Sequence, residues 1–230
     1  MVSEVEVDPM LSKCGTTMAL VLFAYGERLG AQESKLNTNL GAGVTVPVNP
    51  TGQFVGASAN IIVGAGYNFD KHHSLVGQFM WSGLPPDSNA LRPIRLVAQN
   101  RGISGSSNLY TLTANYRFKV EGRVFGAYVI GGGGMYYRHS KLSQEVIVGK
   151  GTVCGPSWEY WGYVCASGLV SDDQTLVSAG STAFGGNAGI GFTIRITEDG
   201  YKFYIESRYH YAPTKGIPTH LIPITVGFSW

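Results

Sequence analysis

Residues 201–213 are predicted to form a strand in which Lys202, Tyr204, Glu206, Arg208 and His210 alternate with a face of mainly aromatic and aliphatic residues, Tyr201, Phe203, Ile205, Tyr209 and Tyr211. The charged and titratable members of this polar set are Lys202, Glu206, Arg208 and His210. Period-two spacing places them on one face of a strand, and a buried charge is costly unless it is paired. Arg195 and Arg117 fall on the corresponding face of two other predicted strands. We therefore predict an interior charge network centred on Glu206, with Arg208, Arg195 and Arg117 as its partners.

Two of the three cysteines, Cys154 and Cys165, stand close together in a predicted loop. Cysteines of exported proteins are usually oxidised, so an exported chain is expected to join these two in a disulfide. The bond would close a short loop, which corresponds to about 2–3 kcal/mol against the unfolded chain. Cys14 lies in the first thirty residues, which are predicted below to be removed.

Other chemistry is poorly supported by the residues present. The pair His72 and His73 has a single nearby aspartate, Asp70, which is too few ligands for a metal site. The glycine-rich segments lack the Gly-Lys-Ser/Thr sequence of a phosphate-binding loop. Basic residues are scattered singly, so the sequence does not predict nucleic-acid binding. We predict no metal and no cofactor.

The N-terminal region has the pattern of an export signal. Lys13 precedes an apolar stretch, and the small pair Gly30-Ala31 leads into a polar segment. This order fits a signal of residues 1–31 that is cleaved after Ala31. Acidic residues before Met10 do not fit a signal, so we expect translation to start at Met10. The predicted mature domain is then residues 32–230.

Residues beyond Leu36 alternate between apolar and small or polar side chains, which is the signature of strands. Eight strands are predicted, at 37–48, 58–70, 74–83, 108–120, 124–140, 182–197, 201–213 and about 220–230. Only 14% of the residues are charged, compared with about 25% in typical soluble domains. The longest uninterrupted apolar run is also far shorter than the roughly 20 residues of a membrane-spanning helix.

Short and long connections alternate strictly along these strands. Tight turns join strands two and three, four and five, and six and seven, whereas residues 49–57, 84–107, 141–181 and 214–219 form longer connections. Transmembrane barrels have this asymmetry, and in lipid a sheet must close because its edge has no partner. We therefore predict an all-β fold, an eight-stranded antiparallel up-and-down transmembrane β-barrel with short periplasmic turns and long outer loops.

The interior of an eight-stranded barrel is nearly filled by side chains, which favours a static polar plug over a gated pore for the Glu206 network. Both interpretations stay open. The segment between the two cysteines carries four aromatic residues, Trp158, Tyr160, Trp161 and Tyr163. These residues could form an exposed adhesive knob or a lid packed over the barrel mouth, and the sequence does not decide between the two.

The chain ends with an apolar residue at every second position from Ile222 and finishes on an aromatic residue, Trp230. This ending resembles the C-terminal signature of bacterial outer-membrane barrels, and residues 36–230 as a whole resemble the OmpA-type transmembrane domain and small porin-like barrels. The resemblance implies that the outer membrane and its lipopolysaccharide surround a monomer. It also implies that Phe228 and Trp230 are read by the barrel-assembly machinery, and that interior salt bridges could gate a pore.

An enzymatic alternative comes from a second resemblance, to the eight-stranded lipid A deacylases, whose last strands carry a His-x-Ser-Asn motif. His210 matches the histidine, but Ala212 stands at the serine position and no carboxylate follows His220. Without the hydroxyl no acyl-enzyme can form. We therefore expect a structural or surface-interaction protein rather than an enzyme, with a narrow pore for ions or small solutes as the alternative.

Overall fold

A computed structural model describes residues 35–97, 103–156, 162–197 and 200–230 of the chain. The predicted signal, residues 1–31, lies outside the described residues and stays a prediction. The description below therefore concerns the compact unit that runs from Lys35 to Trp230.

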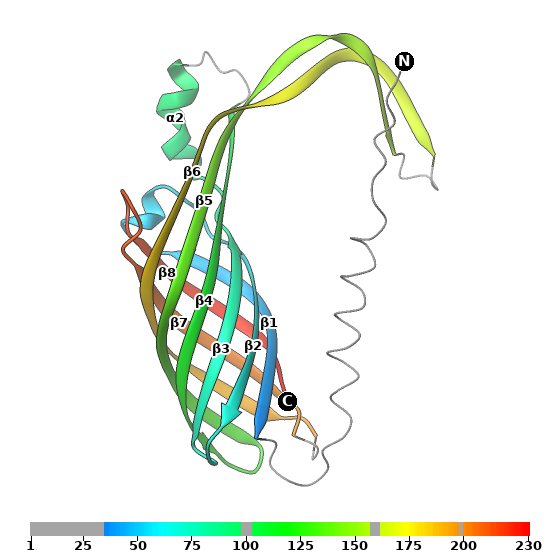
Figure 1. Ribbon diagram of the computed structural model, residues 1–230. Coiled ribbons are helices and arrows are strands. Elements are labelled where there is room, and N and C mark those ends of the chain that lie inside the picture. Colours follow the sequence, from blue (N-terminus) through cyan, green and yellow to red (C-terminus); the bar gives the residue numbers. More distant parts are fainter. Residues whose placement is uncertain (1–34, 98–102, 157–161, 198–199) are drawn as a thin grey trace, which may run out of the picture. The chain divides into compact units, whose positions relative to one another are not determined.

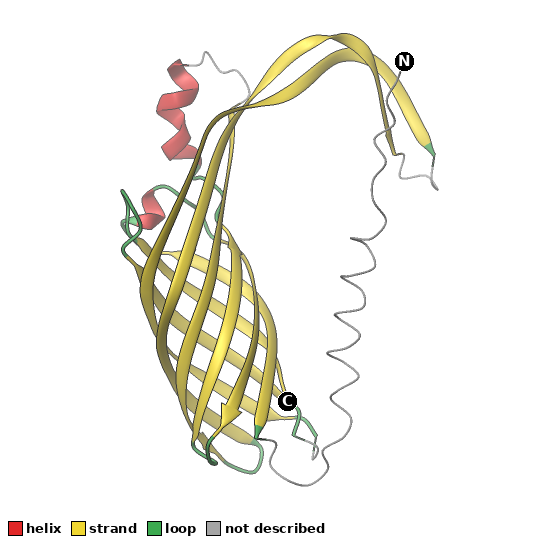
Figure 2. Cartoon of the chain, viewed as in Figure 1, coloured by secondary structure: helices red, strands yellow, loops and turns green. Residues whose placement is uncertain are grey.

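Eight antiparallel strands close into a barrel in which each strand pairs with its neighbours in the sequence (Figures 1 and 2). The strands are β1 Leu36–Pro47, β2 Ser58–Asn68, β3 His73–Gly83, β4 Ile103–Glu121, β5 Phe125–Pro156, β6 Tyr163–Arg195, β7 Lys202–Ala212 and β8 Thr219–Ser229. β1 and β8 close the ring, and backbone hydrogen bonds between Thr38 and Trp230 extend this pairing at 2.8 and 3.0 Å. The predicted fold class and strand number are confirmed.

The two ends of the barrel carry different connections. One end, the turn end, carries the β2–β3, β4–β5 and β6–β7 turns together with Leu36 and Trp230. The opposite end, the loop end, carries the other four connections, of which those at 48–57 and 84–102 are the longest, whereas the β5–β6 connection spans only residues 157–162. These include a short 3-10 helix, η2 (Thr51–Gln53), and the helix α2 (Ser88–Val97). Within the described residues, no helix combines the length and the apolar character needed to cross a membrane.

The predicted loop at 141–181 was wrong. β5 and β6 continue through this region as a long hairpin, paired from Phe125↔Ile194 to Pro156↔Tyr163 with register shifts between Leu142 and Ser143 and between Ile147 and Gly149. β4 also begins earlier than predicted, at Ile103, and follows β5 as far as Gln144. Beyond that point, within the part of the chain that the structure describes, the two strands of the hairpin pair with each other alone. We call residues 145–156 and 163–173 the outer arm.

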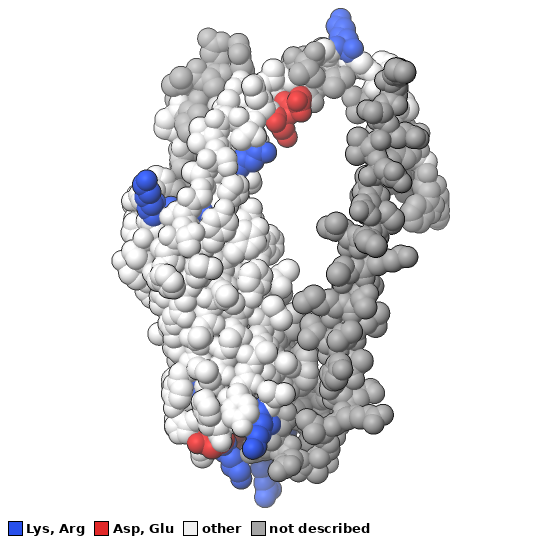
Figure 3. Space-filling view, viewed as in Figure 1, with Lys and Arg blue, Asp and Glu red and all other residues white. Residues whose placement is uncertain are grey.

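Side chains sort by parity into an apolar outer surface and a mostly polar interior. On β4, Tyr110, Leu112 and Phe118 are exposed, and the alternate residues Thr111 and Thr113 are buried. The span from Tyr110 to Phe118 is eight residues, or about 27 Å along the strand. Allowing for strand tilt, this matches the roughly 25 Å apolar band of transmembrane barrels. Figure 3 shows the same division, because the visible wall is almost free of charge between its two ends.

Candidate functional site

The interior charge pair predicted at Glu206 is present. Arg208 donates from Nε to Glu206 Oε1 at 2.6 Å, and its Nη2 lies 2.5 Å from the same oxygen. Tyr128 donates its hydroxyl to Glu206 Oε2 at 2.8 Å. Both charged residues are only 3% exposed. The two ions therefore pair inside the barrel, which offsets part of the cost of burying them.

Arg117 lies next to this pair but contacts a different group. Its guanidinium carbon is 4.7 Å from the centroid of the Tyr128 ring, which is a cation–π distance. Among the described contacts, Arg117 forms no ion pair with Glu206. It contacts the ring of Tyr128, whose hydroxyl donates to Glu206. Tyr128 itself was not predicted as a partner, although its inward parity on β5 could have indicated it.

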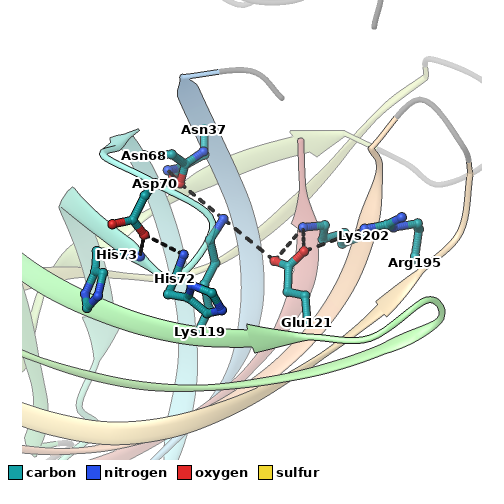
Figure 4. Close-up of polar contacts among 9 residues, drawn as sticks. All are labelled: Asn37, Asn68, Asp70, His72, His73, Lys119, Glu121, Arg195 and Lys202. Atoms are coloured by element: carbon teal, nitrogen blue, oxygen red, sulfur yellow. Dashed lines mark hydrogen bonds and ion pairs between the residues drawn. The ribbon is translucent and has the colours of Figure 1, made fainter. Parts of the chain in front are cut away.

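Arg195 and Lys202 belong to a second cluster, so the predicted partnership of Arg195 with Glu206 was wrong. Both lie close to Glu121 at the turn end (Figure 4): Lys202 Nζ is 2.6 Å from each carboxylate oxygen, and Arg195 Nη2 is 3.7 Å from Oε2. Arg195 pairs with Lys202 in the β6–β7 register, beside the turn. The sequence placed both residues correctly on the inward face of their strands. It did not predict that they lie at the turn end rather than at the level of Glu206.

Glu121 therefore has three basic neighbours, because Lys119 Nζ also approaches Oε1 to 3.7 Å. Sequence reasoning treated Glu121 only as a turn residue and missed this cluster. A usable signal was present, since Glu121, Arg195 and Lys202 all lie within a residue or two of short turns at the same end. Lys119 extends the cluster to Asn68, whose Oδ1 accepts from Lys119 Nζ at 3.3 Å.

The β2–β3 turn at this end is held by Asp70. Its Oδ1 accepts the backbone N–H groups of His72 and His73 at 2.7 and 2.8 Å (Figure 4). The hydrogen bond from the His72 backbone is the main cause that lowers the pKa of the Asp70 carboxyl below its ordinary value of 3.8. Within the described residues, no group of three metal-ligating side chains is present. Asp70 and the two histidines therefore form a turn motif.

The middle of the interior is lined by amide and hydroxyl side chains. Asn115 donates to Gln78 Oε1 at 2.9 Å, and Asn187 donates to Asn115 Oδ1 at 2.8 Å. Ser82 donates to the Thr45 hydroxyl at 2.7 Å. The second and third of these bonds join strands that are not neighbours in the sheet, β4 with β6 and β1 with β3. They therefore fill the centre as well as satisfying buried polar groups.

His210 and Ala212 face the interior near the loop end. The imidazole Nδ1 lies 2.9 Å from the Tyr136 hydroxyl, and both side chains are almost fully buried. Ala212 packs in an apolar cluster whose members are Leu84, Leu109, Tyr136, Ala212 and Leu221. The two positions that resemble the deacylase motif therefore lie away from the lipid-facing surface.

The same apolar cluster closes the interior toward the loop end. Beyond it, Arg138 donates to the backbone carbonyls of Ile217 and Lys215 at 3.0 and 3.2 Å, which fixes the β7–β8 connection. Along its axis the interior thus changes from charged pairs, through amides, to a layer of packed aliphatic and aromatic side chains.

The predicted disulfide is present in the outer arm. Cys154 and Cys165 are directly opposed in the β5–β6 register and their Cα atoms are 4.0 Å apart. The predicted aromatic knob or lid cannot be placed, because Trp158, Tyr160 and Trp161 lie outside the described residues. Tyr163 starts β6 opposite Pro156, and its side chain is likewise not described.

The last strand presents its aromatic residues outward at the turn end. Phe228 packs edge-to-face on Phe203, with ring centroids 5.8 Å apart, and Trp230 stacks on Tyr201 at 6.4 Å. Both are partly exposed on the apolar surface. Their predicted role as an assembly signal stays a prediction, and this placement makes them part of an aromatic girdle.

No protein-family model and no curated protein matches the sequence. Among solved structures, the chain is similar to a major outer membrane protein from Thermus thermophilus, with a TM-score of 0.52, 8% identity, and coverage of 86% of this chain and 99% of that one. It is also similar to neisserial surface protein A, with a TM-score of 0.48, 12% identity and coverage of 85% and 96%.

A third similar structure is Ail, the attachment invasion locus protein of Yersinia pestis, with a TM-score of 0.45, 13% identity and coverage of 85% and 96%. At these identities the comparisons concern the fold alone. The Thermus structure, with its TM-score of 0.52, agrees with the barrel described above, and the predicted resemblance to outer-membrane β-barrels is confirmed at the level of the fold.

Proposed function

We propose that this protein is an integral barrel of the bacterial outer membrane, whose interior is a polar plug and whose outer arm is a surface for interactions outside the cell. The apolar wall supports membrane insertion, because a soluble protein rarely exposes so large a continuous apolar area. The turn end would face the periplasm and the loop end the exterior, as short turns and long loops do in such barrels.

The observation that carries the interaction role is the pairing of the outer arm. Among the described residues, residues 145–156 and 163–173 pair with each other and with no other strand, which leaves one edge of backbone donors and acceptors on each strand without a described partner. Such edges are templates on which an extended segment of another molecule can add. The Cys154–Cys165 disulfide would hold the two strands in register without support from the barrel.

Removal of the arm tests this role. The matched variant replaces residues 145–173 by a two-residue turn and leaves the closed ring of strands unchanged. Cells that display the full chain should attach to extracellular-matrix and abiotic surfaces more strongly than cells that display the shortened chain. Equal attachment by both, at equal surface amounts, would exclude the arm as the interaction surface.

A narrow pore is the second candidate function, and one observation favours it. Arg208 Nη1 and Arg117 Nε are buried atoms for which the described residues supply no hydrogen-bond partner. Water entering the interior could satisfy both. The apolar cluster around Leu109 and Tyr136 opposes this pathway, because ions and water would have to cross a packed layer.

Conductance in a planar bilayer separates plug from pore. For a plug, the wild-type protein and its Glu206→Ala variant should both show no stable single-channel current. A steady current that changes with Glu206→Ala would instead establish a gated pore. Heating the detergent-folded protein before electrophoresis is the control, since a folded barrel and its boiled form migrate differently.

The proposal includes no catalytic step. His210 and Ala212 lie inside the barrel, where a membrane lipid cannot reach them. The lipid A mass profile of expressing cells is therefore expected to stay unchanged. In the proposed setting the protein is a monomer, contacts lipopolysaccharide and depends on the barrel-assembly machinery for insertion. Substituting Phe228 and Trp230 together by Ala should reduce the amount of inserted barrel without changing export.

A further inference from the structure

The outer arm has two edges without a described strand partner, and the opposed cysteines show which backbone groups face them. Cys154 and Cys165 are directly opposed, with their Cα atoms 4.0 Å apart. So short a distance is typical of an antiparallel pair that exchanges no hydrogen bonds, for which about 4.5 Å is usual, rather than of a bonded pair at about 5.5 Å. Two residues along, the hydroxyls of Thr152 and Ser167 lie 3.2 Å apart across the same ladder. In both pairs the N–H and C=O groups therefore point away from the partner strand, toward the edges.

The β5 edge of the arm is poorly suited to pair with another strand. The alternate residues whose backbone groups face this edge are Lys150, Thr152, Cys154 and Pro156. Pro156 has no N–H to donate, and Lys150 is exposed and charged. The register also shifts between Ile147 and Gly149. Proline, lysine and an irregular ladder are features that keep natural edge strands from pairing further.

The β6 edge of the arm lacks these features. β7 joins β6 only from Gly186 onward, so on the side away from β5 the structure describes no strand beside residues 163–185. The alternate residues whose backbone groups face this edge are Tyr163, Cys165, Ser167 and Leu169. Each of them has an N–H, and neither a charged residue nor a proline occurs over residues 163–171. Of the two described edges of the arm, the β6 edge is therefore the better template for another strand.

The β6 edge is complementary to itself. In an antiparallel ladder, residues whose backbone groups face the edge bond to residues of the same kind, so residues 163–171 can pair with a second copy about a two-fold axis at Ser167. The exposed acidic pair Asp172 and Asp173 of each copy then lies at opposite ends of the paired segment. A parallel arrangement would place these acids side by side, which is unfavourable. The joined arms form a four-stranded sheet, and each contributes two strands that its disulfide already holds together, whereas a free peptide must be ordered on binding.

We propose that the β6 edge of the outer arm pairs in antiparallel fashion with the same edge of a second copy of this chain, with Ser167 on the two-fold axis. The inference rests on the proposed function, in which the arm is an interaction surface outside the cell, and it names the partner of that surface. Because the two β6 strands run in opposite directions, the two barrels lie at opposite ends of the joined arms. The pairing therefore joins copies in two facing membranes, and each barrel stays a monomer within its own membrane.

Clustering of vesicles that carry the full chain tests the pairing. The protein is folded into phosphatidylcholine vesicles, and dynamic light scattering follows their clustering as the amount of protein per vesicle is raised. Vesicles with the wild type should cluster. Ser167→Pro removes the N–H at the axis from both copies, and with it the two central hydrogen bonds. The amount of protein needed for half-maximal clustering should therefore rise at least about tenfold.

Thr152→Pro is the matched control, because Thr152 lies directly opposite Ser167 and its backbone groups face the other edge, that of β5. It should leave the clustering unchanged. Equal losses in both variants, or no loss in Ser167→Pro, would overturn the proposal. Vesicles that carry the chain shortened at residues 145–173 should not join clusters of wild-type vesicles. If they do join, the partner surface is not the arm, and the proposal is likewise overturned.

Folding is checked separately in the same vesicles. If the wild type shows no heat-dependent shift on electrophoresis, the membrane-barrel function fails. If it shows the shift but its vesicles do not cluster, only the self-pairing fails, and attachment to other surfaces keeps its own test.

Electrophoresis without reductant shows whether each variant keeps the Cys154–Cys165 bond within one chain. If Ser167→Pro loses this bond, Ser167→Lys takes its place, with Thr152→Lys as its control. Ser167→Lys keeps the N–H but places two like charges opposite one another at the axis. It should weaken clustering at low salt and less so at high salt. Clustering by Ser167→Lys equal to that of the wild type at low salt would overturn the proposal.

Discussion

The barrel wall and the outer arm share two strands, β5 and β6, but these strands are held differently in the two regions. In the wall, residues 126–144 of β5 pair with β4 on one side and β6 on the other. In the arm, each strand has a single neighbour among the described strands, and Cys154 is bonded to Cys165. In the wall, each strand is stabilised by hydrogen bonds to the two strands beside it in the closed sheet. A two-stranded ribbon is only marginally stable alone, and in the arm the disulfide adds a covalent constraint between the two strands.

The largest expected loss of stability comes from leaving a charge unpaired inside the wall. Glu206→Ala leaves Arg208 buried without its partner and should lower the free energy of unfolding by about 3–5 kcal/mol. Urea unfolding in lipid vesicles, followed by tryptophan fluorescence, measures this loss. The double variant Glu206→Leu with Arg208→Leu removes both charges and should recover most of the stability. A double variant as unstable as the single one would contradict the pairing argument.

A smaller and more local effect is expected from Cys154→Ser. Loss of the disulfide removes a constraint of about 2–3 kcal/mol from the arm alone. The arm should become sensitive to trypsin at Lys150, whereas the temperature of the barrel's electrophoretic shift should stay the same. Limited proteolysis of the folded protein, with and without reductant, makes the measurement. A parallel fall in barrel stability would show that the two regions are coupled.

The cluster of Glu121 with Lys119, Arg195 and Lys202 at the turn end should respond less than the interior pair of Glu206 and Arg208. Glu121→Gln leaves three cations near one another, but the group is partly exposed and water screens the repulsion. A loss of about 1 kcal/mol is expected, again by urea unfolding in vesicles. High salt should reduce the difference between the wild type and the variant. A loss as large as that of Glu206→Ala would mean that exposure does not distinguish these two glutamates.

The smallest effect concerns the Asp70 turn. Its carboxyl has a lowered pKa in the folded state, so its contribution is present above the ordinary value of 3.8 and is lost as the pH falls through the lowered value. Protection of the His72 and His73 amides from hydrogen exchange should therefore fall at strongly acidic pH. Asp70→Ala should show the low protection already at neutral pH. Equal protection in both proteins would show that the turn holds without Asp70.

The wall could be predicted from the sequence because lipid and interior impose a strict period of two. Tyr110 and Leu112 alternate with Thr111 and Thr113 for that reason, and the strands were located within about two residues at most ends. Outside the membrane this constraint is absent. Residues of the arm such as Asp172 and Asp173 are exposed side by side, so the region had the composition of a loop and its strands were missed.

The charged site was predicted in part for a related reason. The alternation along a strand indicates which side chains face inward, but not their level along the barrel axis. Glu206 and Arg208 are two residues apart on one strand, so their pairing follows from sequence alone. Arg195 and Glu121 belong to non-adjacent strands, and only their distance from the short turns places them at one level. Counting the number of residues between each charged residue and the nearest short turn would have placed the Glu206 pair and the Glu121 cluster at different levels of the barrel.

The length of the outer arm also bounds where an interaction could take place. From Gln144 to Pro156, β5 advances twelve residues, which is a contour of about 40 Å. Bacterial surfaces carry a layer of sugar above the lipid, and a barrel flush with the membrane would be hidden within it. In the proposed orientation, a cross-linked ribbon of this reach would carry its tip some distance through that layer, and the arm would then serve as a stalk as well as a surface.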